Sequence, residues 1–168
     1  MREMDVLIPL RDKDGAIVAE AIIDGVDAHL ADLRWYRLAS GYVVRTEWNG
    51  GMRRMVYLHR AILKAPASAV VDHVSGDRLD NRRSNLRLTN QSGNMQNRGP
   101  NRDRELPRNV YLIGARYKAQ VKVNGEGLNL GFYASPEEAD TVASAWRAAH
   151  MPFSPDARLR EARRVLTD

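Results

Sequence analysis

The sequence predicts an α+β protein in which short strands, mostly joined as hairpins, outnumber the helices. Apolar and β-branched runs recur along the 168-residue chain and are separated by turn signals such as Asn49-Gly50. A clear helix start, with Ser as N-cap and Pro after it, stands at Ser135-Pro136. Hydrophobic residues make up 43% and charged residues 28%, so we expect a packed core rather than overall disorder.

Residues 1–65 are expected to form an N-terminal module rich in β-hairpins. Apolar runs at 5–10 and 16–23 flank a cluster of turn residues and predict the first hairpin. Asp27 is expected to cap a short helix that continues to about Leu38. A second hairpin and a short helix after it are predicted at residues 41–48, 52–58 and 59–64.

Residues 66–98 combine two short strands, a polar loop and a short helix. The strands are predicted at 70–74 (VVDHV) and 86–89 (LRLT), because both runs are apolar and partly β-branched. The loop between them, SGDRLDNRRSN, has no apolar periodicity, and residues 90–97 can be helical. The segment therefore has the order strand, loop, strand, helix.

Residues 108–152 are expected to form a three-stranded antiparallel sheet with one helix. NVYLI, YKAQVKVNGEG and LNLGFYA predict the strands, and alternation of apolar and polar residues at 119–124 indicates one buried face. The helix begins at Ser135-Pro136 and ends before Pro152. The flanking segments are predicted as a polar linker and as a tail that can form a last helix, at residues 99–107 and 153–168.

Composition and charge narrow the class of protein. The absence of cysteine excludes a disulfide framework and a Cys-ligated structural zinc site. Apolar stretches are short and the N-terminus carries acids, so we expect a cytoplasmic protein that is neither secreted nor a membrane partner. The net charge is +5, yet residues 78–122 alone hold 11 basic and 3 acidic residues. That block favours a polyanion such as nucleic acid, although charge alone leaves a solvated basic face open.

The segment 72–97 contains side chains suited to hydrolytic chemistry. Asp72 and Asn94 offer carboxylate and carboxamide oxygens, which are hard ligands for Mg²⁺ or Mn²⁺. His73 can take a proton from water near neutral pH, and Asn85 can hold a loop by bonding to its backbone. Neighbours on an extended strand point to opposite sides, so the spacing alone does not bring Asp72 and His73 into one site.

The stretch DHVSGDRLDNRRSNLR, followed by an Asn-rich helix, resembles the catalytic motif of HNH endonucleases, the ββα-metal nucleases, and most closely the phage and intron homing type. The resemblance implies that Asp72 and Asn94 hold the metal and that His73 is the general base. It also implies that Asn85 is the structural Asn of the loop, and that Asn97 is a second, structural Asn of the helix. The motif departs from the family at Ser75, where an Asn is expected.

The resemblance implies a metal-dependent endonuclease that hydrolyses phosphodiester bonds in double-stranded DNA and is encoded by a phage or mobile element. It further implies one divalent cation, Mg²⁺ or Mn²⁺, with no structural zinc and no small-molecule substrate. One active site per chain suits a monomer that nicks DNA or a homodimer that cuts both strands. Two alternatives stay open: a non-catalytic DNA-binding protein or regulator derived from such a nuclease, and a protein that binds or cleaves RNA.

Residues 108–152 resemble the plant APETALA/ethylene-response-factor DNA-binding domain, which places its three-stranded sheet in the major groove. Tyr117 stands where a Trp is usual, so we expect modest base specificity, and Trp146 is expected to pack the sheet against the helix. His59, which enters a predicted helix, is expected to be a packing or capping residue. The basic residues expected to contact DNA are Arg82, Arg83, Arg87, Arg98, Arg108, Arg116, Lys118 and Lys122.

Overall fold

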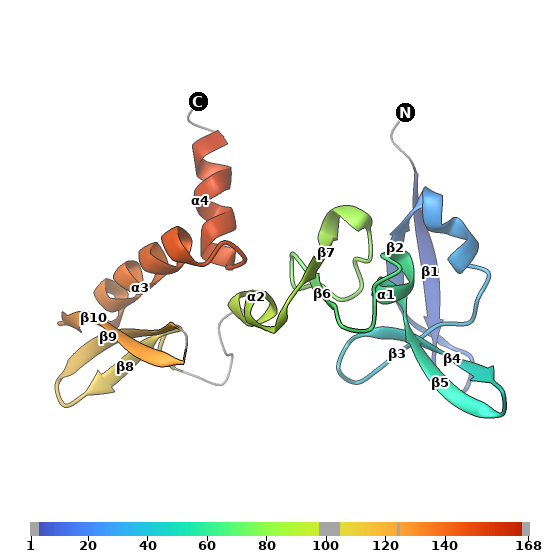
Figure 1. The fold of residues 1–168 in the computed structure, drawn as a ribbon, viewed down its shortest axis with the longest axis horizontal. Coiled ribbons are helices and arrows are strands. Elements are labelled where there is room, and N and C mark those ends of the chain that lie inside the picture. The colour runs from blue at the N-terminus through green and yellow to red at the C-terminus, as the bar shows by residue number, and fades with distance from the viewer. Residues whose placement is uncertain (1–3, 98–104, 124, 166–168) are drawn as a thin grey trace. The chain divides into compact units, whose positions relative to one another are not determined.

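The computed structural model describes residues 4–97, 105–123 and 125–165 (Figure 1). The fold is α+β, as the sequence predicts, with small antiparallel sheets of two or three strands and short helices. Within the described part of the chain, no helix is both long and apolar enough to cross a membrane.

The chain forms two compact units, Met1–Asn94 and Met95–Asp168. The division falls within the short helix α2 (Gln91–Gln96), a few residues before the segment predicted to be a linker. Arg98 and residues 99–104 of that segment lie outside the described residues.

The first unit begins with the two predicted hairpins. β1 (Asp5–Arg11) pairs with β2 (Ile17–Asp24), and β4 (Val43–Asn49) pairs with β5 (Met52–Tyr57), both antiparallel. The short strand β3 (Tyr36–Arg37) extends the second sheet along β4. The tight turn between β4 and β5 uses two glycines with φ of 57° and 80°, a left-handed conformation that other residues rarely adopt.

The segment after β2 corrects the prediction of a helix over 27–38. The structure has only a 3-10 helix, η1 (Gly25–Leu30), and Asp27 lies buried inside it rather than capping it. The Asp27 carboxylate instead accepts hydrogen bonds from Arg83 at 2.8 and 2.9 Å. Trp35 is fully buried and donates its indole N–H to the carbonyl of Leu30 at 2.7 Å. These tertiary contacts override the local helical signal.

The predicted order strand, loop, strand, helix is present after the short helix α1 (Leu58–Ile62). β6 (Val70–His73) and β7 (Leu86–Thr89) form a two-stranded antiparallel sheet, shown in green in Figure 1. The loop between them contains the single 3-10 turn η2 (Arg83–Asn85), and α2 follows β7 directly.

One hydrophobic core holds the first hairpin, α1 and the β6–β7 hairpin together. The loop before η2 also docks on β2: the N–H of Ile22 donates to the carbonyl of Leu79, and the N–H of Asn81 donates to that of Ile22. The N-terminal hairpin is therefore a scaffold for the β6–β7 loop. The buried residues of this core include Ile8, Leu10, Trp35, Leu58, Val71 and Leu86.

The second unit contains a three-stranded antiparallel sheet in the order β10–β9–β8, with α3 packed against it. Its elements are β8 (Val110–Ile113), β9 (Arg116–Val123), β10 (Glu126–Tyr133), α3 (Pro136–His150) and α4 (Pro155–Val165). The helix start at 135–136 is confirmed, because the Ser135 hydroxyl accepts a hydrogen bond from the N–H of Glu138 at 3.2 Å.

The core of the second unit is small and built from Val110, Ala119, Ala139 and Ala143. A buried cation, Arg147, supplements it. Its guanidinium donates to Asp156 at 2.7 and 3.2 Å and to the carbonyl of Arg108 at 2.9 Å. Trp146, expected to pack the sheet against the helix, is half-buried and stacks on His150 with ring centroids 4.5 Å apart.

Candidate active site

Asp72 and His73 are buried neighbours at the end of β6. Their exposed fractions are 6% and 5%. Asp72 stands across from Arg87 on β7, and Arg87 donates two hydrogen bonds to its Oδ2 atom, at 2.9 and 2.7 Å. Arg87, predicted to contact DNA, is therefore engaged with the carboxylate predicted to hold a metal.

The imidazole of His73 is oriented by Asn81, a side chain that is only 1% exposed. The Asn81 Nδ2 group donates to the carbonyls of Arg78 and Leu79, at 3.0 and 3.1 Å. Its Oδ1 atom therefore faces His73 and lies 3.3 Å from Nε2. An amide oxygen can only accept a hydrogen bond, so Nε2 carries the proton and the lone pair of the neutral ring is at Nδ1.

Burial lowers the pKa of His73 below its ordinary value, because the charged imidazolium loses hydration. The hydrogen bond to Asn81 and the negative charge of Asp72 act in the opposite direction but do not reverse the shift. His73 is therefore neutral near pH 7, the state in which an imidazole can accept a proton from water.

A cluster of rings surrounds His73. His59 lies 5.2 Å away between centroids, at a nearly perpendicular angle, and Tyr42 lies 6.1 Å away. Tyr42 and Tyr57 also contact His59, at 5.3 and 5.5 Å. Burial, followed by repulsion from His73 and Arg60, lowers the pKa of His59 to about 3. His59 is a neutral packing partner, and its buried Nδ1 atom has no hydrogen-bond partner among the described residues.

Asn85 closes the loop between β6 and β7. Its Oδ1 atom accepts a hydrogen bond from the N–H of Ser75 at 2.8 Å, and its Nδ2 group donates to the carbonyl of Asp80 at 2.7 Å. Ser75, where the motif has an Asn, accepts a hydrogen bond from the N–H of Asp77 at 3.1 Å. The loop is thus held by side-chain to backbone bonds on both sides.

The two helix asparagines have different surroundings. Asn94 is half-buried on α2, whose first turn is capped by the Asn90 side chain accepting from the N–H of Gly93 at 2.9 Å. Asn97 belongs to the second unit, where its Oδ1 atom accepts a hydrogen bond from Arg158 on α4 at 2.7 Å. The structure thus groups Asp72, His73 and Asn85 on one hairpin, followed by Asn94 on the next helix.

Asp72 and Asn94 fit a hard divalent cation by the chemistry of their donors. One carboxylate and one carboxamide match the small set of protein ligands that Mg²⁺ usually takes, with water and substrate phosphates completing its coordination. Among the residues that the structure describes, no cluster of three or more His, Cys, Asp or Glu side chains could hold a metal ion. The donor set therefore suits an ion that is shared with a phosphate substrate.

Arg82 and Arg83, predicted as phosphate contacts, tie the loop to the first hairpin. Arg82 pairs with Asp80 at 2.7 Å and with Asp5 at 3.1 Å. Arg83 pairs with Asp27 at 2.8 Å, and its backbone N–H donates to the carboxylate of Asp24 at 2.7 Å. Both guanidinium groups thus have a structural task in the first unit.

Three of the residues predicted to contact DNA lie on one face of the sheet of the second unit. Ala119 and Val121 are buried, so their neighbours on β9, Arg116, Lys118 and Lys122, point to the opposite face. Tyr111 and Phe132 stand across from Lys118 on the adjacent strands and share that face. Arg108 lies before β8 and donates to the carbonyl of Gln96 at 3.1 Å.

Sequence reasoning missed Asn81 and the pairing of Arg87 with Asp72. A signal for the pairing was present: once β6 and β7 are aligned as a hairpin, the two residues stand opposite each other. Asn81 gave no such signal, because it looks like any other polar loop residue.

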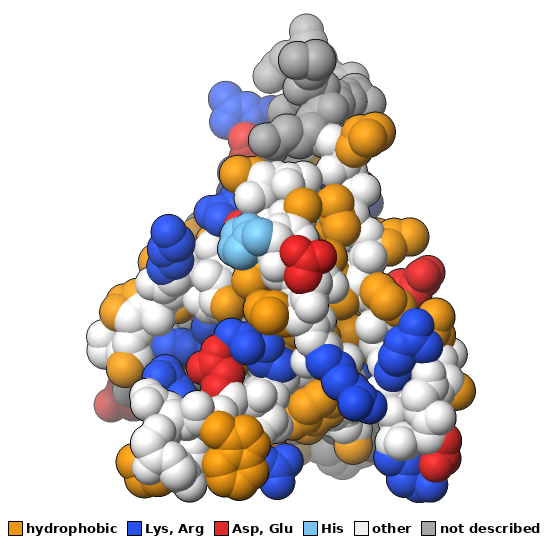
Figure 2. Space-filling model, turned by 90° about the vertical axis from the view of Figure 1, so that its right-hand side faces the viewer, with side chains coloured by type: hydrophobic (Ala, Val, Ile, Leu, Met, Phe, Trp, Pro, Cys, Tyr) orange, Lys and Arg blue, Asp and Glu red, His pale blue; other side chains and the backbone are white. Residues whose placement is uncertain are grey.

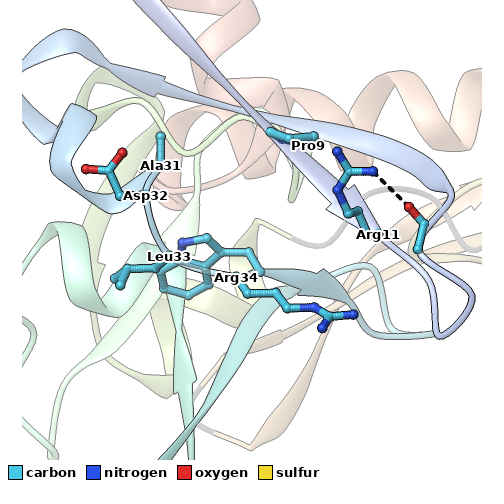
Figure 3. A pocket seen from close by; sticks show the side chains of 8 residues that line it. Pro9, Arg11, Ala31, Asp32, Leu33 and Arg34 are labelled. Atoms are coloured by element: carbon cyan, nitrogen blue, oxygen red, sulfur yellow. Dashed lines mark hydrogen bonds between the residues drawn. The ribbon is translucent and has the colours of Figure 1, made fainter.

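Figure 3 shows a separate hollow beside the first hairpin, and none of the predicted site residues lines it. Its lining residues are Pro9, Arg11, Gly15, Ala31, Asp32, Leu33, Arg34 and Trp35.

Residues 56–96 match the family model of the HNH endonuclease. The match covers α1, the β6–β7 hairpin and α2, and so includes Asp72, His73, Asn85 and Asn94. Comparison with curated proteins and with solved structures gave no match. The chain therefore carries an HNH endonuclease domain at residues 56–96, and this domain makes it a nuclease, a hydrolase of phosphodiester bonds.

Proposed function

We propose that this protein is a divalent-metal-dependent endonuclease that cleaves double-stranded DNA at the β6–β7 hairpin. The observation that carries the proposal is the arrangement of His73, buried beside Asp72 and held by Asn81 with its lone pair at Nδ1. A neutral imidazole fixed in one tautomer is what a general base requires.

In the proposed reaction, His73 Nδ1 takes a proton from the water that attacks the scissile phosphate. Asn81 keeps the ring in place and its hydrogen bond strengthens as the ring becomes charged, because Nε2 is the donor. Asp72 and Asn94 would hold the metal, which would supply stabilisation of the negative charge that develops on the phosphate. Arg87 fixes the Asp72 carboxylate from the neighbouring strand. As the water oxygen bonds to phosphorus, the P–O3′ bond breaks and the leaving 3′ oxygen takes up a proton from solvent, so the products are a 5′-phosphate and a 3′-hydroxyl.

The second unit is proposed to bind duplex DNA through the face of its sheet that carries Arg116, Lys118 and Lys122. Tyr111 and Phe132 lie among these cations, and aromatic and basic side chains together suit contacts to sugars, bases and phosphates. The likeness of this sheet and helix to the APETALA/ethylene-response-factor domain rests on the sequence pattern.

The homing type and an origin in a phage or mobile element rest on the likeness of residues 72–97 to that group of nucleases. We propose that the protein acts inside the cell on genomic DNA, as a monomer that nicks or a homodimer that cuts both strands. The number of cleavage sites tests the homing type. A homing enzyme cuts one or few sites in a whole genome, and mapping of the new 5′-phosphate ends would count them.

The function is tested by incubating the full chain with supercoiled plasmid in Mg²⁺, in Mn²⁺ and in EDTA. We expect nicked or linear DNA with either ion and none in EDTA. Asp72→Asn and Asn94→Ala should cripple cleavage, whereas Asn90→Ala, which removes a helix cap on the same element, should reduce it far less. Undiminished cleavage in EDTA would contradict the proposed metal, and DNA binding without cleavage would favour a regulator derived from a nuclease.

A further inference from the structure

The hairpin β4–β5 exposes large apolar side chains next to cations. Trp48 is 73% exposed, Met52 is 75% exposed and Met55 is 44% exposed, and apolar side chains exposed close together often mark an interaction site. Arg53 and Arg54 are exposed on the returning strand. Figure 2, which views the molecule from the side of the first unit, shows basic and hydrophobic side chains interleaved over its lower part.

The register of the hairpin sorts these residues between its two faces. Trp48 stands opposite Arg53, and Thr46 stands opposite Met55, so these four share one face. Arg54 points to the other face, where it stands opposite Glu47. The face with Trp48, Arg53 and Met55 is called the Trp48 face below.

The Trp48 face leads to the ring cluster beside His73. Two residues after Met55, the same face presents Tyr57, which contacts His59, and His59 contacts His73. The distance along β4 from Val44, opposite Tyr57, to Trp48 is four residues, or about 13 Å. Duplex DNA rises about 3.4 Å per base pair, so this distance corresponds to about four base pairs.

The charge of the hairpin favours an anion on this face. Its one acidic residue, Glu47, pairs with Arg45. Among the described residues, neither Arg53 nor Arg54 has a carboxylate within ion-pair distance, and the Trp48 face itself carries no acid. Exposed aromatic and thioether groups beside an arginine suit the sugar edge and phosphates of a nucleic acid better than an acidic or purely apolar partner.

We propose that the Trp48 face is a second DNA-contacting surface, which holds the duplex on one side of the scissile phosphate. The inference rests on the proposed function and extends it, since the occupant is the DNA substrate itself. Arg53 contacts a backbone phosphate, and Trp48 packs against a sugar or base at the groove edge.

Binding of the full chain to a 30-base-pair duplex in EDTA tests the proposal, with anisotropy read at several salt concentrations. Trp48→Ala should weaken binding about 10-fold, from the loss of the aromatic contact at the groove edge, and Trp48→Phe should restore most of it. Arg53→Ala should lower the slope of log K against log salt by about one unit. Arg54→Ala is the matched control: it removes the same charge from the opposite face and should leave the slope unchanged.

Cleavage separates this inference from the proposed function. Trp48→Ala and Arg53→Ala should raise KM in Mg²⁺ and leave kcat near that of the wild type, because neither residue is in the catalytic hairpin. If the wild type cleaves DNA and both variants bind and cleave as it does, the Trp48 face is not a DNA surface. If Trp48→Ala abolishes self-association in sedimentation and leaves DNA binding intact, the occupant is a second copy, which also overturns the inference. If the wild type neither binds nor cuts duplex DNA, both the proposed function and this inference are wrong.

Discussion

The two units of the chain hold their polar side chains in opposite ways. In the first unit, the loop between β6 and β7 is fixed by the buried carboxamides of Asn81 and Asn85, which bond to backbone and to His73. In the second unit, one buried cation, Arg147, supports a small core, and the polar residues of β9 lie at the surface. The first arrangement fixes the position of the proposed base, His73, by a hydrogen bond. The second presents a charged surface whose side chains can adapt.

The two arrangements suit two different tasks, the exact placement of a general base and the binding of DNA. A general base works only in one place and one tautomer, so its supports are buried and numerous. Phosphate contacts need positive charge within reach and tolerate variation in position.

Removal of the base should have the largest effect. His73→Ala should lower the rate of plasmid cleavage by about 10²- to 10⁴-fold, the usual worth of a general base. DNA affinity should change little, because a neutral imidazole adds little to phosphate binding. The measurement is single-turnover cleavage at saturating protein. His150→Ala, on α3 of the other unit, is the control and should be nearly silent. Near-normal rates in His73→Ala would remove this residue from the mechanism.

Loss of the buried cation should unfold the second unit before the first. Arg147→Leu leaves Asp156 without its main partner, and breaking a buried ion pair costs about 3–5 kcal/mol. Amide exchange should accelerate in β8–β10 and stay unchanged in β6–β7. Arg160→Leu, at an exposed position on α4, is the control. Equal loss of protection in both units would show that they are not independent.

The loop carboxamide should matter less for stability than Arg147. Asn85→Ala leaves the N–H of Ser75 and the carbonyl of Asp80 without their partner, at about 1–3 kcal/mol for a buried group left unpaired. The denaturant midpoint of the first unit should fall accordingly, and cleavage should fall with it. Gln91→Ala, exposed on α2, should leave both unchanged. If the Asn85→Ala variant has the stability and the cleavage rate of the wild type, the loop does not need these hydrogen bonds.

The effect that is smallest at pH 7 concerns His59, whose pKa is about 3 in the folded chain against an ordinary value of 6.5. The unfolded chain binds this proton more readily, so the wild type loses stability as the pH falls from about 6.5 to 3, by up to about 1.4 kcal/mol per pH unit. His59→Phe removes the titration and the unpaired Nδ1, so it should be about 1 kcal/mol more stable at pH 7. Its advantage should grow at lower pH. If the free energies of unfolding of the wild type and of His59→Phe differ by the same amount at pH 7 and at pH 5, this account is wrong.

The sequence predicts the local order of the chain well, because hairpin turns, alternation and helix caps depend on neighbours. For the same reason it predicts β6, which carries Asp72 and His73, and β7, which follows Asn85. The failures involve long-range contacts: Asp27 meets Arg83, 56 residues later, and so does not cap a helix. Asn81 is similar, since only the folding of its own loop against Ile22 turns it toward His73. Such pairings depend on tertiary geometry that no local pattern encodes.

The division of work between the units is tested most directly by a chain that ends at Arg104. It keeps the core, the loop network and the predicted Asp72, His73 and Asn94, and it lacks the sheet with Arg116, Lys118 and Lys122. We predict that it folds, nicks plasmid in Mg²⁺ at saturating protein with nearly the full-length rate, and binds duplex DNA much more weakly. A folded fragment that never cuts, or one that binds DNA as tightly as the full chain, would contradict the account.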